Sequence, residues 1–367
     1  MNENRFFTKA RLIYLCISTV SLIIAAILLI TIRIQSGALP SQLAADRWTS
    51  DDESFAQISA FISPDASVTD DSILQIVSTV ESKLKEASLM PEDDNIRAWI
   101  YSSSTEADIQ ISTSRASVNT CVTGVDGEYF MFHPLKLLSG YYFTGTDLSY
   151  DRIVIDEDLA WQLFGSFDVD GMEVRINEKP YIIAAVIQKD TDKASLSVYG
   201  DSPRAYISYL ALSDIMGEPQ SITCFEAVLP DPISKFAYNM LSESIGIGDK
   251  LVEVKENSSR YNIISLLSNI KTFSRLSVRQ NAIVLPFWEN AARIIEIRLT
   301  ILFFFAIILI LPFVSFVISS SVSLLRRRKW RLADIKARII DYFEEQSIKR
   351  YEKKQKIKER IDIDENT

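Results

Sequence analysis

The sequence predicts an α+β extracytoplasmic domain held between two transmembrane α-helices. Two uncharged runs, 12–32 and 299–325, are each as long as the about 20 apolar residues that a helix needs to cross a bilayer. The region between them alternates strand-like and helix-like patterns. It is also strongly acidic, with 20 basic and 37 acidic residues over 36–295, whereas 326–367 has 14 basic and 9 acidic. This distribution predicts two spans around an outer domain.

The first run indicates an uncleaved anchor, because it exceeds the about 7–15 residues of a signal-peptide core and Arg33 follows without a cleavage pattern. Basic residues precede this run and follow the second one, so the positive-inside rule places both termini in the cytoplasm. The predicted segments are a cytoplasmic N-terminus (1–11), a first span (12–34), an outer domain (35–296), a second span (297–325) and a basic cytoplasmic tail (326–367). An acidic outer domain argues against nucleic acid or anionic lipid as its partner.

The first half of the outer domain predicts one helix among strands. Alternating residues predict a strand over 55–63, before Pro64. The apolar spacing over 70–89 predicts a helix with Asp70 and Asp71 in its first turn, where carboxylates suit the positive end of the helix dipole. Three further strands are predicted over 95–102, 107–113 and 117–125. This order predicts an α+β layer with the helix on one face of the sheet.

The middle of the chain carries an ordered set of short elements. IVI at 153–155 predicts a buried strand, Asp156 a helix N-cap and Gly165 the C-cap of that helix. MEVRI and YIIAAVI, joined by NEKP, predict a hairpin over 172–187. Beyond these, IISLLSNIKTF (263–273) has helical spacing, and Pro286 is placed to start the helix that enters the second span.

These elements resemble the periplasmic core domain of MacB/FtsX-type ABC transporter permeases. The matching pieces are GVDGEYF, LLSGYYF, IVIDEDLAWQLFG and VRINEKPYIIAAVI, which cover about residues 120–190. Tyr141 replaces the family's arginine, and Ala184–Ala185 replace the glycine of its last element. The resemblance implies a MacB-like core domain with an inserted subdomain at about 140–230 and a stalk at about 257–296.

The basic segment after the second span is the main candidate site. It holds Arg326, Arg327, Arg328, Lys329 and Arg331, followed by an apolar helical stripe of Leu332, Ile335 and Ile339. Juxtamembrane basic residues bind lipid headgroups and set topology. The segment also resembles the family's "RRREIGILKALG"-like run, where the permease meets its ATPase. Lipid contact and ATPase docking therefore both stay open.

The resemblance implies a permease-like subunit that couples a separate ABC-type ATPase to its outer domain. Family members have one span before the domain and three after it, so a reduced two-span form is expected to pair with itself or with a fuller permease. Expected partners are that ATPase, membrane lipids, and an extracellular peptide, lipid or cell-wall enzyme, in the inner or cytoplasmic membrane of a bacterium. The alternative is a membrane-anchored binding or sensing module without an ATPase.

No catalytic, cofactor or metal site is predicted. The sequence has no P-loop, G-x-S-x-G or H-E-x-x-H motif, and His133 is its single histidine. The carboxylates of 92–94 and 156–158 lack the spacing of a calcium loop and are interpreted as solvated surface. Cys121 and Cys224 both lie in the outer domain, where two alternatives stay open, a disulfide bond or two separate thiols.

Overall fold

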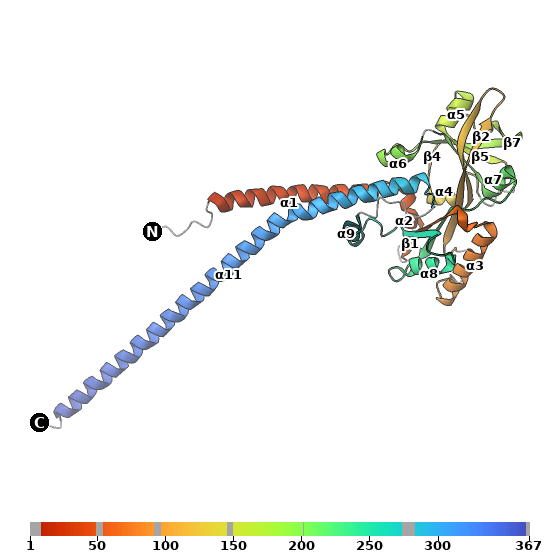
Figure 1. The fold of residues 1–367 in the computed structure, drawn as a ribbon. Helices are drawn as coiled ribbons and strands as arrows, with labels where there is room; N and C mark the ends of the chain where they lie inside the picture. Colours follow the sequence, from red (N-terminus) through yellow and green to blue (C-terminus); the bar gives the residue numbers. More distant parts are fainter. Residues whose placement is uncertain are drawn as a thin grey trace. The chain divides into compact units, whose positions relative to one another are not determined.

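A computed structural model describes residues 9–48, 54–91, 97–144, 150–200, 202–273 and 283–364, with side chains throughout except at 10, 326–334 and 351–364. The chain divides into two compact units, one formed by 1–28 with 305–367 and the other by 29–304. Figure 1 shows two long helices and a mixed α/β domain. The carboxylates of 92–94 lie outside the described residues.

Two helices are long and apolar enough to cross a membrane, as predicted. These are α1 (Lys9–Ser36) and α11 (Phe287–Asp364), with candidate spans at Arg11–Ser36 and Phe287–Leu325. Within the unit that holds 1–28 and 305–367 the two helices are in contact. The Tyr14 hydroxyl donates to the Pro312 carbonyl (3.2 Å), and the Ser21 hydroxyl donates to the Leu309 carbonyl (2.6 Å). Small buried residues on this face of α1 let helices approach closely in a membrane; they are Ser18, Ser21 and Ala25.

The domain is built on a sheet of ten strands within the described part of the chain. Their bounds are β1 (Phe55–Ile62), β2 (Ile100–Ser112), β3 (Ser117–Gly127), β4 (Lys136–Gly140), β5 (Arg152–Asp156), β6 (Glu173–Ile176), β7 (Lys179–Gln188), β8 (Arg204–Ser208), β9 (Cys224–Pro230) and β10 (Val252–Glu256). The order is β10-β1-β9-β2-β3-β8-β5-β7-β4, and β6 pairs with both β2 and β7. The pairing of β6 therefore closes six of the strands into a ring.

Short helices connect the strands. They are η1 (Pro40–Gln42), α2 (Ala44–Trp48), η2 (Pro64–Ala66), α3 (Asp70–Glu86), α4 (Tyr129–Phe132), α5 (Glu157–Phe164), α6 (Lys193–Val198), α7 (Tyr209–Met216), α8 (Phe236–Ile245) and α9 (Ile263–Lys271). The predicted strand over 55–63 and helix over 70–89 are confirmed as β1 and α3. The α3 helix buries Ile73, Ile76, Val80 and Leu84 in a core shared with β1, β9 and α8.

The prediction of two separate strands in the first half of the domain was wrong. The predicted strands 95–102 and 107–113 form the single strand β2, in so far as their residues are described. The polar run Ser102–Glu106 between them resembles a loop in sequence. It stays extended because β2 pairs with β3 on one side and β9 on the other, where Ser103 lies opposite Asp126 and Phe225. Pairing on both sides satisfies the backbone whatever the side chains are.

The second core lies among β3, β5, β7, β8, α5 and α7. Here the predicted strand, caps and hairpin are confirmed. The interpretation of Asp156 as solvated surface was wrong, because its side chain is fully buried and accepts from Tyr199 and Arg204 inside the domain. The Asp156 carboxylate accepts from the Leu159 amide (2.8 Å) and caps α5, and Gly165 ends that helix with φ of +71°. The β6–β7 hairpin turns at Asn177 and Glu178, both with positive φ. This pair of left-handed residues suits the right-handed twist of a tight hairpin.

Candidate functional site

The predicted basic segment lies within α11, and its side chains fall among those that the structure does not describe. Arg326, Arg327, Arg328, Lys329, Arg331 and Leu332 belong to this group. Ile335 and Ile339 are described and are 54% and 50% exposed. A helical rotation of about 100° per residue places these two isoleucines on one face of α11. The structure thus presents part of the predicted apolar stripe to solvent, and its partner stays a prediction.

A buried ionic cluster ties the α/β domain to the start of α11. The loop after β10 carries Arg260, whose guanidinium donates both terminal nitrogens to Glu289, with Nη1–Oε2 at 2.7 Å and Nη2–Oε1 at 2.9 Å. Its Nε atom donates to Oε2 of Glu296 (2.9 Å). The two glutamates lie seven residues apart on α11, which is two helical turns, so they share a face. All three side chains are buried.

Further elements join the same cluster. Arg293 donates from Nε to Glu289 Oε1 (2.8 Å) and from Nη2 to Glu253 Oε1 of β10 (2.6 Å). Asn269 of α9 donates its Nδ2 to Glu296 Oε1 (2.9 Å). Gln42 of η1, just beyond α1, accepts from Arg260 Nη1 (3.2 Å). The first turns of α11 are therefore bonded to β10, α9 and η1 at once.

This arrangement has the geometry of a strong ion pair. A bidentate arginine–carboxylate pair has two parallel charge-assisted hydrogen bonds and a fixed orientation. Removal of one partner from a buried pair leaves the other charge without compensation, which costs about 3–5 kcal/mol. The cluster can therefore hold the α/β domain and the first turns of α11, its root, in one defined orientation.

A second buried pair lies beside the first turn of α11. His133, after α4, bonds through Nε2 to Oε2 of Glu226 on β9, and the Ser59 hydroxyl donates to Oε1 of the same carboxylate (2.9 Å). The His133 ring lies 4.7 Å from the Trp288 ring, centroid to centroid. His133 thus links the sheet to α11 through Trp288.

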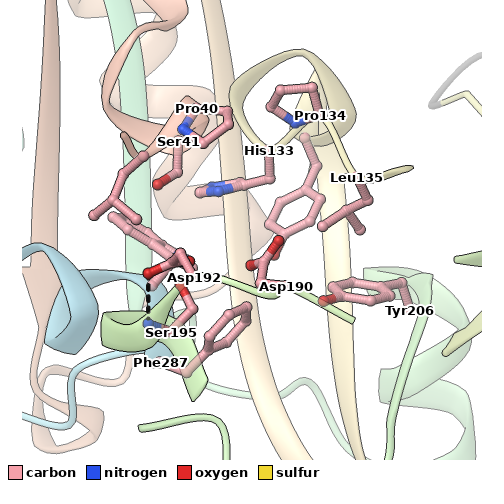
Figure 2. Close-up of a pocket in the computed structure, with 13 residues that line it drawn as sticks. Pro40, Ser41, His133, Pro134, Leu135, Asp190, Asp192, Ser195, Tyr206 and Phe287 are labelled. Carbon is pink, nitrogen blue, oxygen red and sulfur yellow. Dashed lines mark hydrogen bonds between the residues drawn. The ribbon is translucent and has the colours of Figure 1, made fainter. Parts of the chain in front are cut away.

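A small cavity adjoins His133 (Figure 2). Its volume is about 40 Å³, and Figure 2 shows Ser41, Asp190, Asp192 and Tyr206 around it. Burial raises the pKa of the Asp190 carboxyl, and the Asp192 carboxylate raises it further. A space of this size holds one or two water molecules rather than a cofactor. Over the described ranges, no group of three or more His, Cys, Asp or Glu side chains is placed to hold a metal ion.

The two cysteines of the outer domain are free thiols. Cys121 lies on β3 and Cys224 on β9, with β2 between them. Neighbouring strands lie roughly 4.8 Å apart, so β3 and β9 are about 10 Å from each other. This distance exceeds the Cα separation that a disulfide spans. Of the two alternatives, the structure has the separate thiols. Burial, with Glu106 nearby, raises the pKa of the Cys121 thiol to about 12, which disfavours the thiolate, its nucleophilic form.

Sequence reasoning missed the ionic cluster. Its signal was present in the spacing of Glu289, Arg293 and Glu296, which follow one another at intervals of four and three residues just before the apolar run from Leu299. Charges at these positions are expensive when the protein buries them, unless they are paired. The partner, Arg260, lies in a loop with no periodicity, so its contact depends on tertiary structure.

Two solved structures are similar to part of this chain. No curated protein sequence matches the chain. Among solved structures, the extracellular domain of the noncanonical ABC-type transporter YknZ from Gram-positive bacteria is 16% identical, with a TM-score of 0.38, and the match covers 54% of this chain and 99% of that domain. The periplasmic region of MacB from Actinobacillus actinomycetemcomitans is also 16% identical, with a TM-score of 0.42, covering 61% of this chain and 94% of that one.

The family is shown by the sequence itself. The model of the MacB-like periplasmic core domain matches residues 15–237, which is more than half of the chain. The two apolar helices on either side of the domain fit a membrane protein. The predicted resemblance is confirmed, and the chain belongs to the MacB-like periplasmic core domain family of ABC-type transporter permeases.

Proposed function

We propose that this chain is the membrane subunit of an ABC transporter or mechanotransmission complex and couples a separate cytoplasmic ATPase to its extracytoplasmic domain. One observation carries the proposal. The α11 helix begins inside the buried cluster of Arg260, Glu289 and Glu296 and also includes the apolar run and the basic segment. A single element thus bears both the ectodomain attachment and the predicted docking segment.

The buried cluster provides the firm attachment between the domain and α11 that such coupling needs. A displacement of the α11 root relative to β10 would separate Arg260 from Glu289 and Glu296. It would also separate Arg293 of α11 from Glu253 of β10. Because three of these side chains are fully buried, their separation would leave charges unpaired at low dielectric. The ectodomain therefore follows the α11 root rather than sliding over it.

The proposed partners follow from the chemistry of each end. The basic residues 326–331 suit anionic headgroups or an acidic ATPase surface, and the stripe of Leu332, Ile335 and Ile339 suits an apolar groove. We place both termini in the cytoplasm of a bacterium and propose a second copy or a fuller permease as the oligomer partner. On the outside, an extracellular peptide, lipid or cell-wall enzyme would receive the motion.

The test is purification of the full chain from its own cells in mild detergent, with identification of the proteins that co-purify. We expect a stoichiometric ABC-type ATPase with the natural protein and its loss with Ile335→Ser/Ile339→Ser, because each change removes apolar contact area. Ile348→Ser is the matched control, since Ile348 is 58% exposed and lies on the opposite face of α11.

Two outcomes contradict the proposal. Retention of the ATPase by the double variant would show that this stripe is not the docking face. Purification of the chain without any ATPase, under conditions that keep a known transporter intact, would favour the alternative of a membrane-anchored binding or sensing module. In that case the basic segment serves as a topology signal and lipid contact alone.

A further inference from the structure

We infer that α9 is an interfacial membrane helix that lies on the outer leaflet and inserts Ile263, Ile264 and Leu267 among the lipids beside the root of α11. The helix belongs to the same compact unit as residues 283–304, so its place next to that root is defined. The inference requires α11 to cross the membrane, and it does not require an ATPase.

The contacts of α9 fix which side faces α11. Asn269 donates to Glu296 (2.9 Å), Leu266 is buried, and the Tyr261 hydroxyl just before the helix donates to the Ala292 carbonyl (3.4 Å). The two contact residues of α11 lie shortly before Leu299, where the uncharged run begins. Figure 1 shows α9 beside this part of the molecule. The helix is thus held next to the turns of α11 that lead into the uncharged run.

The side of α9 that faces away from α11 is apolar and exposed. Ile263, Ile264 and Leu267 are 68%, 82% and 46% exposed. With a rotation of about 100° per residue these three side chains fall within one third of the helix circumference. Lys271 lies on the same face in the last turn, from where its amine can reach the headgroups while its stem stays in the apolar layer.

The charge of α9 also favours lipid. Residues 263–271 contain one lysine and no acidic residue, in an outer domain with 20 basic and 37 acidic residues over 36–295. The ends of the two membrane helices in the same unit also expose apolar side chains, Ile34 of α1 and Ile301 of α11. An apolar helix face that is bonded to the start of a membrane helix, and free of acid, matches a lipid surface.

The experiment places an environment-sensitive fluorophore on the face. The full chain, with Cys16→Ser, Cys121→Ser and Cys224→Ala, carries Ile264→Cys labelled with nitrobenzoxadiazole and is reconstituted in phosphatidylcholine vesicles. We expect a blue-shifted emission and a strong loss of fluorescence with lipids that carry a nitroxide near the top of the acyl chain. The control is Leu74→Cys on α3, which is 53% exposed on a helix that packs against α8.

Two results would overturn the inference. The Ile264→Cys label would be in water if its emission and quenching equalled those of the Leu74→Cys label. A blue-shifted label that lipid-borne nitroxides fail to quench would show that protein, such as a second copy of the chain, covers this face. A parallel measurement with the nitroxide deep in the bilayer should give weaker quenching, because an interfacial helix sits about 5–10 Å into the headgroup boundary.

Discussion

Arg260 is the residue on which the junction depends most. Its guanidinium is paired with two carboxylates, Glu289 and Glu296. Because both carboxylates are buried, loss of this contact would be costly in free energy. Exposed ion pairs in the same domain, such as Arg175 with Glu173, have similar distances but little energetic effect because solvent screens them.

At this scale we expect Arg260→Met to lower the free energy of unfolding by about 3–5 kcal/mol, because Met keeps the volume but leaves two buried carboxylates without a cation. Thermal unfolding of the full-length protein in detergent is the measurement. Arg175→Met serves as the control, with a change within about 0.5 kcal/mol. Recovery of stability in Arg260→Met/Glu289→Gln/Glu296→Gln would confirm the cause, whereas an unchanged single variant would contradict it.

At the scale of elements, α5 shows how one side chain connects a helix to its sheet. Asp156 ends β5 and accepts from the Leu159 amide (2.8 Å), the Arg204 amide of β8 (2.8 Å) and the Tyr199 hydroxyl (3.1 Å). The cap of α5 is therefore also a bond between β5 and β8. Asp192 is a simpler N-cap, since its carboxylate accepts from the Ala194 and Ser195 amides of the helix that it caps, α6.

We expect Asp156→Ala to cost about 2–4 kcal/mol, since it removes a cap and leaves buried donors without a partner. Asp192→Ala, the matched control, should cost about 1 kcal/mol. Chemical unfolding of both variants is the measurement, and equal costs would contradict the assignment.

The same residue predicts a pH dependence. Burial raises the pKa of Asp156 to about 6 against the contrary effect of its hydrogen bonds. The folded protein then binds a proton that the unfolded chain has already lost, so this contribution to stability falls as pH rises from about 4 to about 6. The slope of unfolding free energy with pH in that window should diminish in Asp156→Ala, and an unaltered slope would disprove the shift.

At the scale of the whole molecule, charge predicts the orientation. Clusters of basic residues lie at 5–11 and 326–331, outside both apolar runs, and the segment between the runs carries a net negative charge. We expect tags at both termini to be digested by protease in inside-out vesicles and protected in right-side-out vesicles, because positive flanks stay in the cytoplasm. Residues of the domain, such as those of α3, should show the reverse pattern. Protection of one terminus only would mean a single crossing.

Much of the fold could be predicted because its signals are local. The cap at Asp156, the end of α5 at Gly165 and the hairpin turn at 177–178 each depend on neighbouring residues, and all are confirmed. The joined strand β2 could not be predicted, since its polar middle stays extended through pairing with β3 and β9. The limits of the inserted subdomain at 140–230 stay a prediction.

The sequence by itself determined the two apolar helices, the acidic domain between them and its family, because length, charge and ordered motifs are properties of the chain alone. Tertiary structure alone decided the junction. Arg260, Glu253 and Asn269 come from three separate segments, and each reaches the α11 root only after the sheet has formed. Their contacts depend on distances in space that no spacing along the chain encodes, and the burial of Arg260 makes the loss of its partners costly.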